Sequence, residues 1–576
     1  MKIMTEMVQL TIDGQTVEVP AGTTVLEAAH QLGIKIPTLC YMKELNEIGA
    51  CRVCLVEVQG ARTLQASCVL PVSPGMVVNT KSPAVREARR TAVELIISDH
   101  PQECLTCARN RTCELRVLAE EVGVRQIPYT GATTQLPVDA SSPSIVRDPR
   151  KCVLCRRCVA VCQQVQQVGC LQAAERGFDT NITPAFGDNL NEAVCTFCGQ
   201  CVLVCPTGAL TEKNETARVW SVLANPEKHV VVQVAPAVRV SIGEELGYEP
   251  GTVLTGKLVA ALRRLGFDRV FDTNFAADLT IMEEGHELLE RLEEGGSLPL
   301  ITSCCPGWVK YIEHFFPDLL KHLSSCKSPH QMFGAVAKTY YASKHGIDPA
   351  SIVVVSIMPC TAKKFEIQRP EMQASSYQDV DIVLTTRELG AMLREAGLDL
   401  RNLPDEDFDQ PLGQSTGAGV IFGTTGGVME AALRTVAEVT SGQPLAEIEF
   451  RQVRGFNGIK EAEVELKGRR LKLAVAHGLA NAKQLLTALQ KGEAEYHFIE
   501  IMACHGGCIG GGGQPIPTTW EVRQKRAQGI YQCDSQARFR KSHENPAIKE
   551  LYAEFLGHPL SHKSHQLLHT RYQPRR

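Results

Sequence analysis

Alternating apolar and polar residues near the start of the chain predict a β-hairpin. Residues 8–19 alternate on either side of a central Asp13-Gly14 pair, which favours a two-residue primed turn. A short helix is predicted over residues 25–31, with Thr23 or Thr24 as its N-terminal cap. The chain therefore begins with a small α+β element.

Longer helices and strands follow. An amphipathic helix is predicted over residues 85–97, with Ser82 as cap and Pro83 in its first turn. From about residue 213 to 530, apolar strand-like runs alternate with helical stretches, which is typical of an α/β domain. The predicted strands cover residues 229–234, 269–271, 298–302, 352–357, 382–385, 471–476 and 497–501. The predicted helices include residues 255–265, 308–320 and 388–396.

Composition limits the class of protein. A chain of 576 residues with 44% hydrophobic content is expected to form two or more domains. The net charge of −4 indicates neither a nucleic-acid-binding surface nor an acidic tail. The first residues soon turn polar, so no signal peptide is expected, and the longest apolar runs fall short of the about 20 residues of a membrane span. We expect a cytoplasmic protein without nucleic-acid or membrane partners.

Cysteine usage is unusual, with 23 residues gathered in tight groups. Short C-x2-C spacings in a chain without secretory signals indicate metal sites rather than disulfides. The first group has the spacing C-x10-C-x2-C-x13-C and consists of Cys40, Cys51, Cys54 and Cys68. With the hairpin and helix, it resembles a β-grasp 2Fe–2S ferredoxin and the N-terminal domain of the large iron–sulfur subunit of complex I. A structural zinc site is the alternative.

The second group has the spacing H-x3-C-x2-C-x5-C and consists of His100, Cys104, Cys107 and Cys113. It resembles the His-ligated 4Fe–4S site of the same complex I subunit and of modular hydrogenases. A neutral imidazole in place of one thiolate makes the cluster less negative, so its potential should rise, by analogy with His-ligated Rieske centres.

The third group is a repeat of two C-x2-C-x2-C-x3-C runs. This spacing is typical of bacterial two-cluster ferredoxins, in which the fourth cysteine of each run ligates the other cluster. One 4Fe–4S cluster is therefore expected on Cys152, Cys155, Cys158 and Cys205. The second is expected on Cys195, Cys198, Cys201 and Cys162.

Three further cysteine segments lie in the α/β region. They are Thr302-Ser303-Cys304-Cys305-Pro306-Gly307-Trp308, Met358-Pro359-Cys360-Thr361-Ala362-Lys363 and Ala503-Cys504-His505-Gly506-Gly507-Cys508, followed by Ile509 and four glycines. Each segment follows a predicted strand, and ligands of open α/β sheets sit beyond the carboxyl ends of strands. We therefore expect these cysteines to converge, with the glycines allowing close backbone approach to a bulky cofactor.

Together the three segments resemble the signature of the iron-only (FeFe) hydrogenases. The resemblance implies that the 4Fe–4S half of an H-cluster is held by Cys305, Cys360, Cys504 and Cys508. In the family, the cysteine at the position of Cys508 bridges to a two-iron unit carrying carbon monoxide, cyanide and an azadithiolate. The resemblance also implies that Lys363 hydrogen-bonds a cyanide and that Pro236, Met358 and Met502 line the cofactor pocket.

The same resemblance implies a proton route. Cys304 corresponds to the thiol that passes protons to and from the cofactor amine; the alternative is a buried cysteine packed as a small hydrophobe. If residues 282–291 are helical, Glu284, Glu287 and Arg291 lie on one face, which read alone is typical of a solvated surface. The family relay instead implies that both glutamates carry protons, and Ser324 matches the serine of that route.

A few positions stand outside the family pattern. Ala237 and His330 replace the Ser and Gln of other members, and Cys170, Cys326 and Cys533 match no ligand spacing. A C-terminal helix is predicted after Asn545, with Pro546 at its first position and Gly557 beyond its end. The tail resembles the small-subunit-like C-terminus of the family.

The predicted fold is therefore multidomain, α+β and α/β. It comprises a β-grasp 2Fe–2S domain (1–80), a His-Cys 4Fe–4S domain (81–140), a two-cluster ferredoxin-like domain (141–212), a large α/β H-cluster domain (213–530) and a helical small-subunit-like tail (531–576). The expected cofactors are an H-cluster, three 4Fe–4S clusters and one 2Fe–2S cluster.

These features predict an FeFe hydrogenase of an anaerobe that interconverts H₂ with protons and electrons. We expect the catalytic subunit of an electron-bifurcating complex linked to ferredoxin and NAD(P). No G-x-G-x-x-G in a βαβ context is visible, so flavin- or NAD(P)-binding diaphorase subunits would be its partners. The alternative is a stand-alone ferredoxin-dependent hydrogenase. A non-catalytic iron–sulfur assembly protein or a sensory relative is disfavoured, because the ligand cysteines and the proton thiol are all retained.

Overall fold

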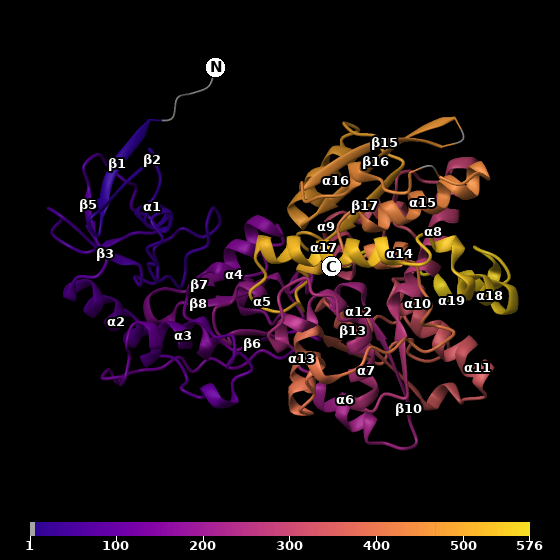
Figure 1. Ribbon diagram of the computed structural model, residues 1–576, viewed down its shortest axis with the longest axis horizontal. Helices are drawn as coiled ribbons and strands as arrows, with labels where there is room; N and C mark the ends of the chain where they lie inside the picture. Colours follow the sequence, from indigo (N-terminus) through magenta and orange to yellow (C-terminus); the bar gives the residue numbers. More distant parts are fainter. Residues whose placement is uncertain (1–5, 446, 467, 576) are drawn as a thin grey trace. The chain divides into compact units, whose positions relative to one another are not determined.

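The computed structural model describes residues 6–445, 447–466 and 468–575, and its chain divides into two compact units (Figure 1). Unit 1 contains the chain up to Gln164, Gly169–Ala193 and Val204–Thr211. Unit 2 contains Val165–Val168, Val194–Leu203 and the chain from Glu212 onward. Within the described ranges, no helix has the length and apolar character needed to cross a membrane.

Unit 1 begins with a five-stranded sheet in the order β2-β1-β5-β3-β4. Its strands are β1 (Met7–Ile12), β2 (Gln15–Pro20), β3 (Leu55–Val58), β4 (Gln65–Ala66) and β5 (Val77–Asn79). The predicted hairpin is confirmed, since β1 and β2 pair antiparallel and both turn residues have positive φ. Thr24 caps α1 (Val25–Gln31) through a capping box with Glu27, and the helix buries its apolar face in the core of the sheet.

Two helices follow the sheet, α2 (Pro83–Ser98) and α3 (Glu114–Glu121). The side chain of Ser82 accepts a hydrogen bond from the Val85 amide, which confirms the predicted cap. Both helices share a small core with the cysteine loop that precedes β3. The shorter elements of the ferredoxin-like segment are β6 (Ile145–Arg147), α4 (Arg157–Ala160), β7 (Gln172–Ala174), β8 (Asn181–Thr183), α5 (Gln200–Val204) and β9 (Leu210–Glu212).

Unit 2 contains two four-stranded sheets where the sequence indicated a single α/β pattern. The first has the order β11-β10-β13-β14, is wholly parallel, and consists of β10 (His229–Val234), β11 (Arg269–Asp272), β13 (Ile352–Met358) and β14 (Ile382–Thr385). The second has the order β12-β17-β16-β15 and consists of β12 (Leu300–Ile301), β15 (Ile459–Leu466), β16 (Arg469–His477) and β17 (Phe498–Met502). Only the β15–β16 pair is antiparallel in this sheet. Figure 1 shows the second sheet at the top of unit 2 and the first below it.

Helices cover both sheets. They are α6 (Thr216–Leu223), α7 (Thr255–Leu265), α8 (Thr273–Glu294), α9 (Pro306–Phe315), α10 (Pro329–Val336), α11 (Ala342–His345), α12 (Ala362–Glu366), α13 (Thr386–Glu395), α14 (Gly417–Ile421), α15 (Gly427–Ser441), α16 (Leu479–Gln490) and α17 (Trp520–Gln536). The longest of these, α8, places Phe275 and Leu279 in the core of the first sheet and Ile281 and Leu288 in the core that contains β16 and β17. This helix therefore links the two cores of unit 2.

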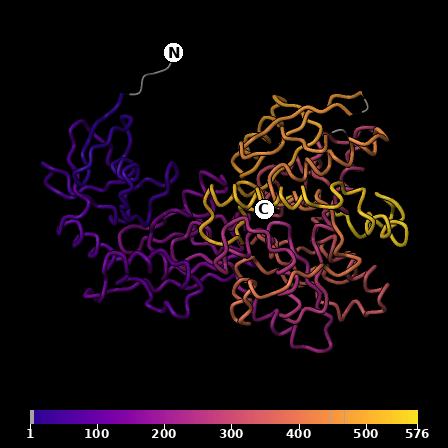
Figure 2. Tube along the Cα trace, in the orientation of Figure 1, coloured from indigo at the N-terminus to yellow at the C-terminus, as the bar shows by residue number. Residues whose placement is uncertain are grey.

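The C-terminal tail lies along unit 2 (yellow in Figure 2). It contains α18 (Pro546–Leu551), capped by Asn545 as predicted, and α19 (His562–Leu568). The Lys327 amide donates to the Leu568 carbonyl at 2.8 Å, and the Thr570 amide donates to the Ser325 carbonyl at 2.7 Å. These bonds fix the tail next to the segment that follows α9.

Candidate active site

The three cysteine segments of unit 2 converge on one cavity, but they come from two sheets. Cys305 follows β12 and stands at the N-cap of α9, and Cys504 follows β17 in the same sheet. Cys360 follows β13 of the other sheet, and Cys508 comes from the glycine-rich loop beyond Cys504. All four side chains line the same cavity, and none of them forms a disulfide. The expected convergence at strand ends is thus present, with both sheets contributing.

The rest of the cavity wall is mainly apolar. Pro236, Met358 and Met502 line it, as do Phe422 and Ala277. Its glycine loop is tightly packed: a Cβ at Gly507 would lie 2.6 Å from the Thr425 amide nitrogen, and one at Gly511 would lie 2.1 Å from the Pro359 carbonyl. The Ala503 amide donates to the Cys305 sulfur at 3.4 Å. A mainly apolar cavity with four cysteine sulfurs and backbone donors fits an anionic iron–sulfur group.

Lys363 reaches the cavity from α12 and is held in place by a buried carboxylate. Its ammonium donates to the Cys304 carbonyl at 3.2 Å and to Glu366 at 2.8 Å. Burial opposes ionisation of Glu366, but the Lys363 charge and His330 lower its pKa to about 2. Glu366 was not singled out from the sequence, although it lies one helical turn after Lys363 and was visible as an i, i+3 pair.

His330, which departs from the family pattern, also lines the cavity. Its Nε2 lies 2.5 Å from a Glu366 oxygen, and its Nδ1 lies 3.3 Å from the Ser356 hydroxyl. Burial, followed by the Lys363 charge, lowers the pKa of His330 to about 4, so the ring is neutral near pH 7. A carboxylate only accepts, so Nε2 carries the proton and Nδ1 accepts from Ser356. Ala237, the other departure, is fully buried nearby in the core that contains Met502.

Cys304 lines the cavity beside the cysteines expected to bind the cluster. Burial raises the pKa of its thiol well above the ordinary value, and the charge of Glu284 raises it further. The thiol is therefore protonated near neutral pH. Glu284 is itself buried on α8, and its Oε2 has no hydrogen-bond partner among the described residues. Burial raises the pKa of Glu284 to about 8, with the interaction with Ser324 opposing the shift.

Glu287 lies one turn further along α8 and is the centre of a hydrogen-bond network. Arg291 donates to its Oε1 at 2.5 Å, and the Ser324 hydroxyl donates to its Oε2 at 3.1 Å. Glu284 and Glu287 are 1% and 6% exposed, so the interpretation of this helix face as a solvated surface is wrong. The face is buried because the segment around Ser324 and the tail cover it.

The network extends into the C-terminal tail, which the sequence did not reveal. The Ser325 hydroxyl lies 3.1 Å from Glu287 Oε2 and 2.8 Å from His569 Nδ1. His569 Nε2 lies 3.0 Å from Glu283, which also accepts from the Tyr552 hydroxyl at 2.5 Å. Ser325 has one proton and two acceptors, so its hydroxyl can bond either Glu287 or His569. Neither Ser325 nor His569 carries a motif; only the spatial contact connects them.

Two cysteine groups of unit 1 also gather as expected from their spacing. Cys54 and Cys68 have their sulfurs 3.3 Å apart, and hydrogen bonding between Cys40 and Cys51 dominates the shifts of their pKa values. His100, Cys104, Cys107 and Cys113 line a second, separate pocket. The buried Nδ1 of His100 has no partner among the described residues, and a Cβ at Gly208 would lie 2.8 Å from the Cys107 sulfur. Both sites offer the ligand atoms that an iron–sulfur group needs, and the second has a pocket to hold it.

One of the two expected sets of ferredoxin-like cysteines gathers at a single pocket. Cys152, Cys155, Cys158 and Cys205 line one pocket in unit 1, as the cross-ligation pattern requires. Cys162 belongs to unit 1, whereas Cys195, Cys198 and Cys201 belong to unit 2. The second of these clusters stays a prediction.

Comparison with protein families agrees with this site. The family description "Iron only hydrogenase large subunit, C-terminal domain" matches residues 228–512, and "Iron hydrogenase small subunit" matches residues 520–575. Three N-terminal matches are "2Fe-2S iron-sulfur cluster binding domain" (5–83), "NADH-ubiquinone oxidoreductase-G iron-sulfur binding region" (89–128) and "NADH-quinone oxidoreductase subunit 3, ferredoxin-like domain" (142–211). The chain belongs to the iron-only hydrogenases, a family of oxidoreductases that act on H₂.

Individual relatives extend this similarity over nearly the whole chain. NADP-reducing hydrogenase subunit HndD of Solidesulfovibrio fructosivorans is 54% identical, covering 98% of this chain and 99% of that protein. Iron hydrogenase 1 of Clostridium pasteurianum is 42% identical, covering 98% of this chain and 100% of that protein. A solved structure of a variant of the FeFe-hydrogenase HydA1 from Chlamydomonas reinhardtii is 47% identical, with a TM-score of 0.57 over 63% of this chain and 99% of that chain.

Proposed function

We propose that this chain is the catalytic subunit of a multimeric, electron-bifurcating hydrogenase linked to NAD(P) and ferredoxin. The observation that carries the hydrogenase activity is the single cavity lined by Cys305, Cys360, Cys504 and Cys508. Similarity to an NADP-reducing hydrogenase subunit over both complete chains supports the multimeric setting. The sequence has no dinucleotide-binding fingerprint of its own, so flavin and NAD(P) would be bound by partner subunits.

The four cysteines would hold the 4Fe–4S half of an H-cluster. The two-iron unit of that cofactor supplies the hydrogen chemistry when bound. Pro236, Met358 and Met502 would exclude water from it, and Lys363 would place a compact positive charge against its anionic ligands. Because Glu366 is ionised and holds Lys363, the ammonium keeps one orientation. His330 acts through Glu366, so we assign it a positioning role.

Protons would move between Cys304, Glu284, Ser324 and Glu287 toward the partly buried Arg291. Support comes from the buried, unpaired Glu284 oxygen and from the Ser324 hydroxyl bonded to Glu287. A carboxyl with a pKa of about 8 exchanges protons readily near neutral pH. Electrons would use the 2Fe–2S site, the His100 site and the two ferredoxin-like 4Fe–4S sites, Cys162 included. A cytoplasmic location also stays a prediction.

Infrared spectroscopy of anaerobically matured protein tests the proposal. Carbon monoxide and cyanide stretches should appear, together with hydrogen evolution. Measurement of the native mass after mild purification then distinguishes the multimeric complex from a stand-alone hydrogenase. A lone 63.0 kDa species that evolves hydrogen with ferredoxin would favour the stand-alone enzyme and contradict the complex. Matured protein without these stretches would contradict the hydrogenase assignment itself.

Substituting His569 by alanine tests whether the Ser325–His569 branch carries protons. We expect turnover to fall by about tenfold, less than for a direct relay, because Glu287 keeps its contact with Arg291 at the end of the proposed main route. Infrared bands should be unchanged, and Ser325→Ala should add no further loss to His569→Ala. His562→Ala, at the first position of α19, whose C-cap is His569, is the matched control. Turnover of His569→Ala equal to that of the control would rule out the branch.

A further inference from the structure

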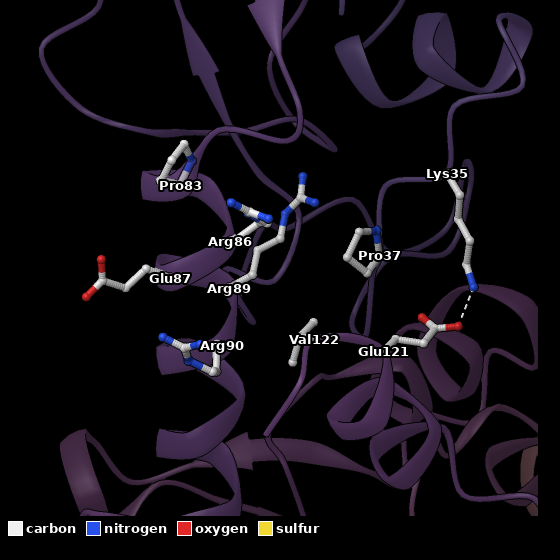
Figure 3. A pocket seen from close by; sticks show the side chains of 9 residues that line it. All are labelled: Lys35, Pro37, Pro83, Arg86, Glu87, Arg89, Arg90, Glu121 and Val122. Atoms are coloured by element: carbon white, nitrogen blue, oxygen red, sulfur yellow. Dashed lines mark hydrogen bonds and ion pairs between the residues drawn. The ribbon is translucent and has the colours of Figure 1, made fainter. Parts of the chain in front are cut away.

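Unit 1 carries a cleft of about 720 Å³ beside α2 (Figure 3). Its wall contains the three arginines Arg86, Arg89 and Arg90, with Lys35, Glu87 and Glu121 as the other charged residues. None of the cysteine groups lines it. The cleft is thus separate from every site assigned above.

Cationic groups in this cleft exceed the carboxylates that can neutralise them. Lys35 pairs with Glu121, and the Arg90 guanidinium lies 3.7 Å from Glu94. Exposed Arg86 has no ion-pair partner among the described residues, and Figure 3 shows the Glu87 carboxylate pointing away from the arginines. The surplus positive charge favours an anionic occupant.

Arg89 gives the cleft a donor that needs a partner. The residue is only 8% exposed, its Nε donates to the Leu55 carbonyl at 3.0 Å, and its buried Nη2 has no partner among the described residues. An unsatisfied buried donor costs about 1–3 kcal/mol, and more when it is charged. A carboxylate entering the cleft would satisfy Nη2 with a charge-assisted hydrogen bond.

The cleft also adjoins the expected 2Fe–2S site. Leu55, the partner of Arg89, directly follows Cys54 in the chain. Burial lowers the pKa of Arg89, and the negative charge of Cys54 opposes this shift, so the two groups lie within electrostatic reach. An anionic molecule seated on Arg89 therefore sits next to a cysteine of that site.

We propose that this cleft is the docking site of an acidic one-electron iron–sulfur carrier protein, whose carboxylates bind Arg86, Arg89 and Arg90. The proposal rests on the proposed function, since it assigns the 2Fe–2S site as the point where that carrier exchanges electrons. One electron leaves the reduced carrier and enters the 2Fe–2S centre, or the reverse, and no bond or proton is transferred. Paired hydrogen bonds from each guanidinium to a carboxylate would orient the carrier. The attraction between the positive cleft and the acidic carrier would speed their association.

Binding of a small acidic ferredoxin to the full-length holoprotein tests this site. We expect Arg86→Glu with Arg90→Glu to weaken binding at least tenfold at low salt and to remove most of its salt dependence. The matched control is Arg62→Glu with Arg176→Glu, which makes the same change in net charge at two exposed residues outside the cleft. The rate at which the ferredoxin reduces the 2Fe–2S centre, followed by electron paramagnetic resonance, should fall in parallel.

Equal affinity in the Arg86/Arg90 variant and the control would overturn the proposal. Binding of inorganic phosphate in the cleft without competition against ferredoxin would overturn it too, because the site would then belong to a small anion. Hydrogen evolution by the unsubstituted chain with reduced methyl viologen tests the proposed function separately. Viologen is a cation and is not expected to bind a cleft lined by arginines. Failure of one proposal is therefore distinguishable from failure of the other.

Discussion

Replacing Cys304 by alanine is expected to lower hydrogen turnover by about two to four orders of magnitude, the usual contribution of a positioned proton donor. The thiol lines the cavity, and burial keeps it protonated near neutral pH, so it is placed to deliver a proton. Alanine removes the proton carrier but none of the four expected cluster ligands. Infrared spectra should therefore keep the carbon monoxide and cyanide bands while hydrogen evolution collapses.

The control for this experiment is Cys533→Ala, which removes a partly buried cysteine that does not line the cavity. Its turnover should match that of the unsubstituted chain. Full activity in Cys304→Ala would refute the proton role. Loss of the infrared bands in that variant would instead mean that Cys304 supports the cluster.

Glu284→Gln is expected to lower turnover about a hundredfold, because an amide cannot exchange a proton with Cys304. Glu284→Asp should restore part of the activity, since a carboxyl is retained. The pH dependence gives a second readout. The carboxyl has a pKa of about 8, so activity that depends on its proton should change near that pH, and this change should disappear in the Gln variant.

The same substitution should alter stability with a defined sign. The pKa of Glu284 rises from the ordinary 4.5 to about 8 on folding, so between these values the folded chain holds a proton that the unfolded chain has lost. Stability therefore falls as pH rises through this window, by up to about 1.4 kcal/mol per pH unit, and levels off above it. Glu284→Gln should remove this slope. The denaturant midpoints of the unsubstituted apoprotein and of Glu284→Gln, measured between pH 4.5 and pH 8, check this prediction. The same pH dependence in both proteins would contradict the raised pKa of Glu284.

Local sequence patterns predicted most individual elements well. Strands 229–234 and 382–385 and helix 255–265 have the predicted bounds. Strand 298–302 shrinks to Leu300–Ile301, since Pro299 cannot donate to a ladder. Helix 308–320 begins at Pro306 and ends at Phe315, just before Phe316 and Pro317, where the backbone of a residue preceding proline avoids helical angles.

The assembly of these elements was not predictable from local pattern. The two sheets of unit 2 depend on pairings between β12 and β17, almost 200 residues apart in sequence. The burial of Glu284 and Glu287 depends on Ser324, Ser325 and the tail residue His569. Only the family resemblance indicated that these glutamates were more than surface charges. Contacts such as Glu366 with His330 need the folded chain.

The origin of the four cavity cysteines in two different sheets has a mechanical consequence. A bound metal centre would cross-link the two sheets of unit 2. Its ligands would be Cys305, Cys504 and Cys508 on the side of one sheet and Cys360 on the side of the other. The free energy of metal binding then adds to the free energy that holds the two sheets together. Oxidative destruction of the centre would therefore destabilise the fold as well as end catalysis. Molecules damaged by air would be cleaved by proteases faster than intact ones.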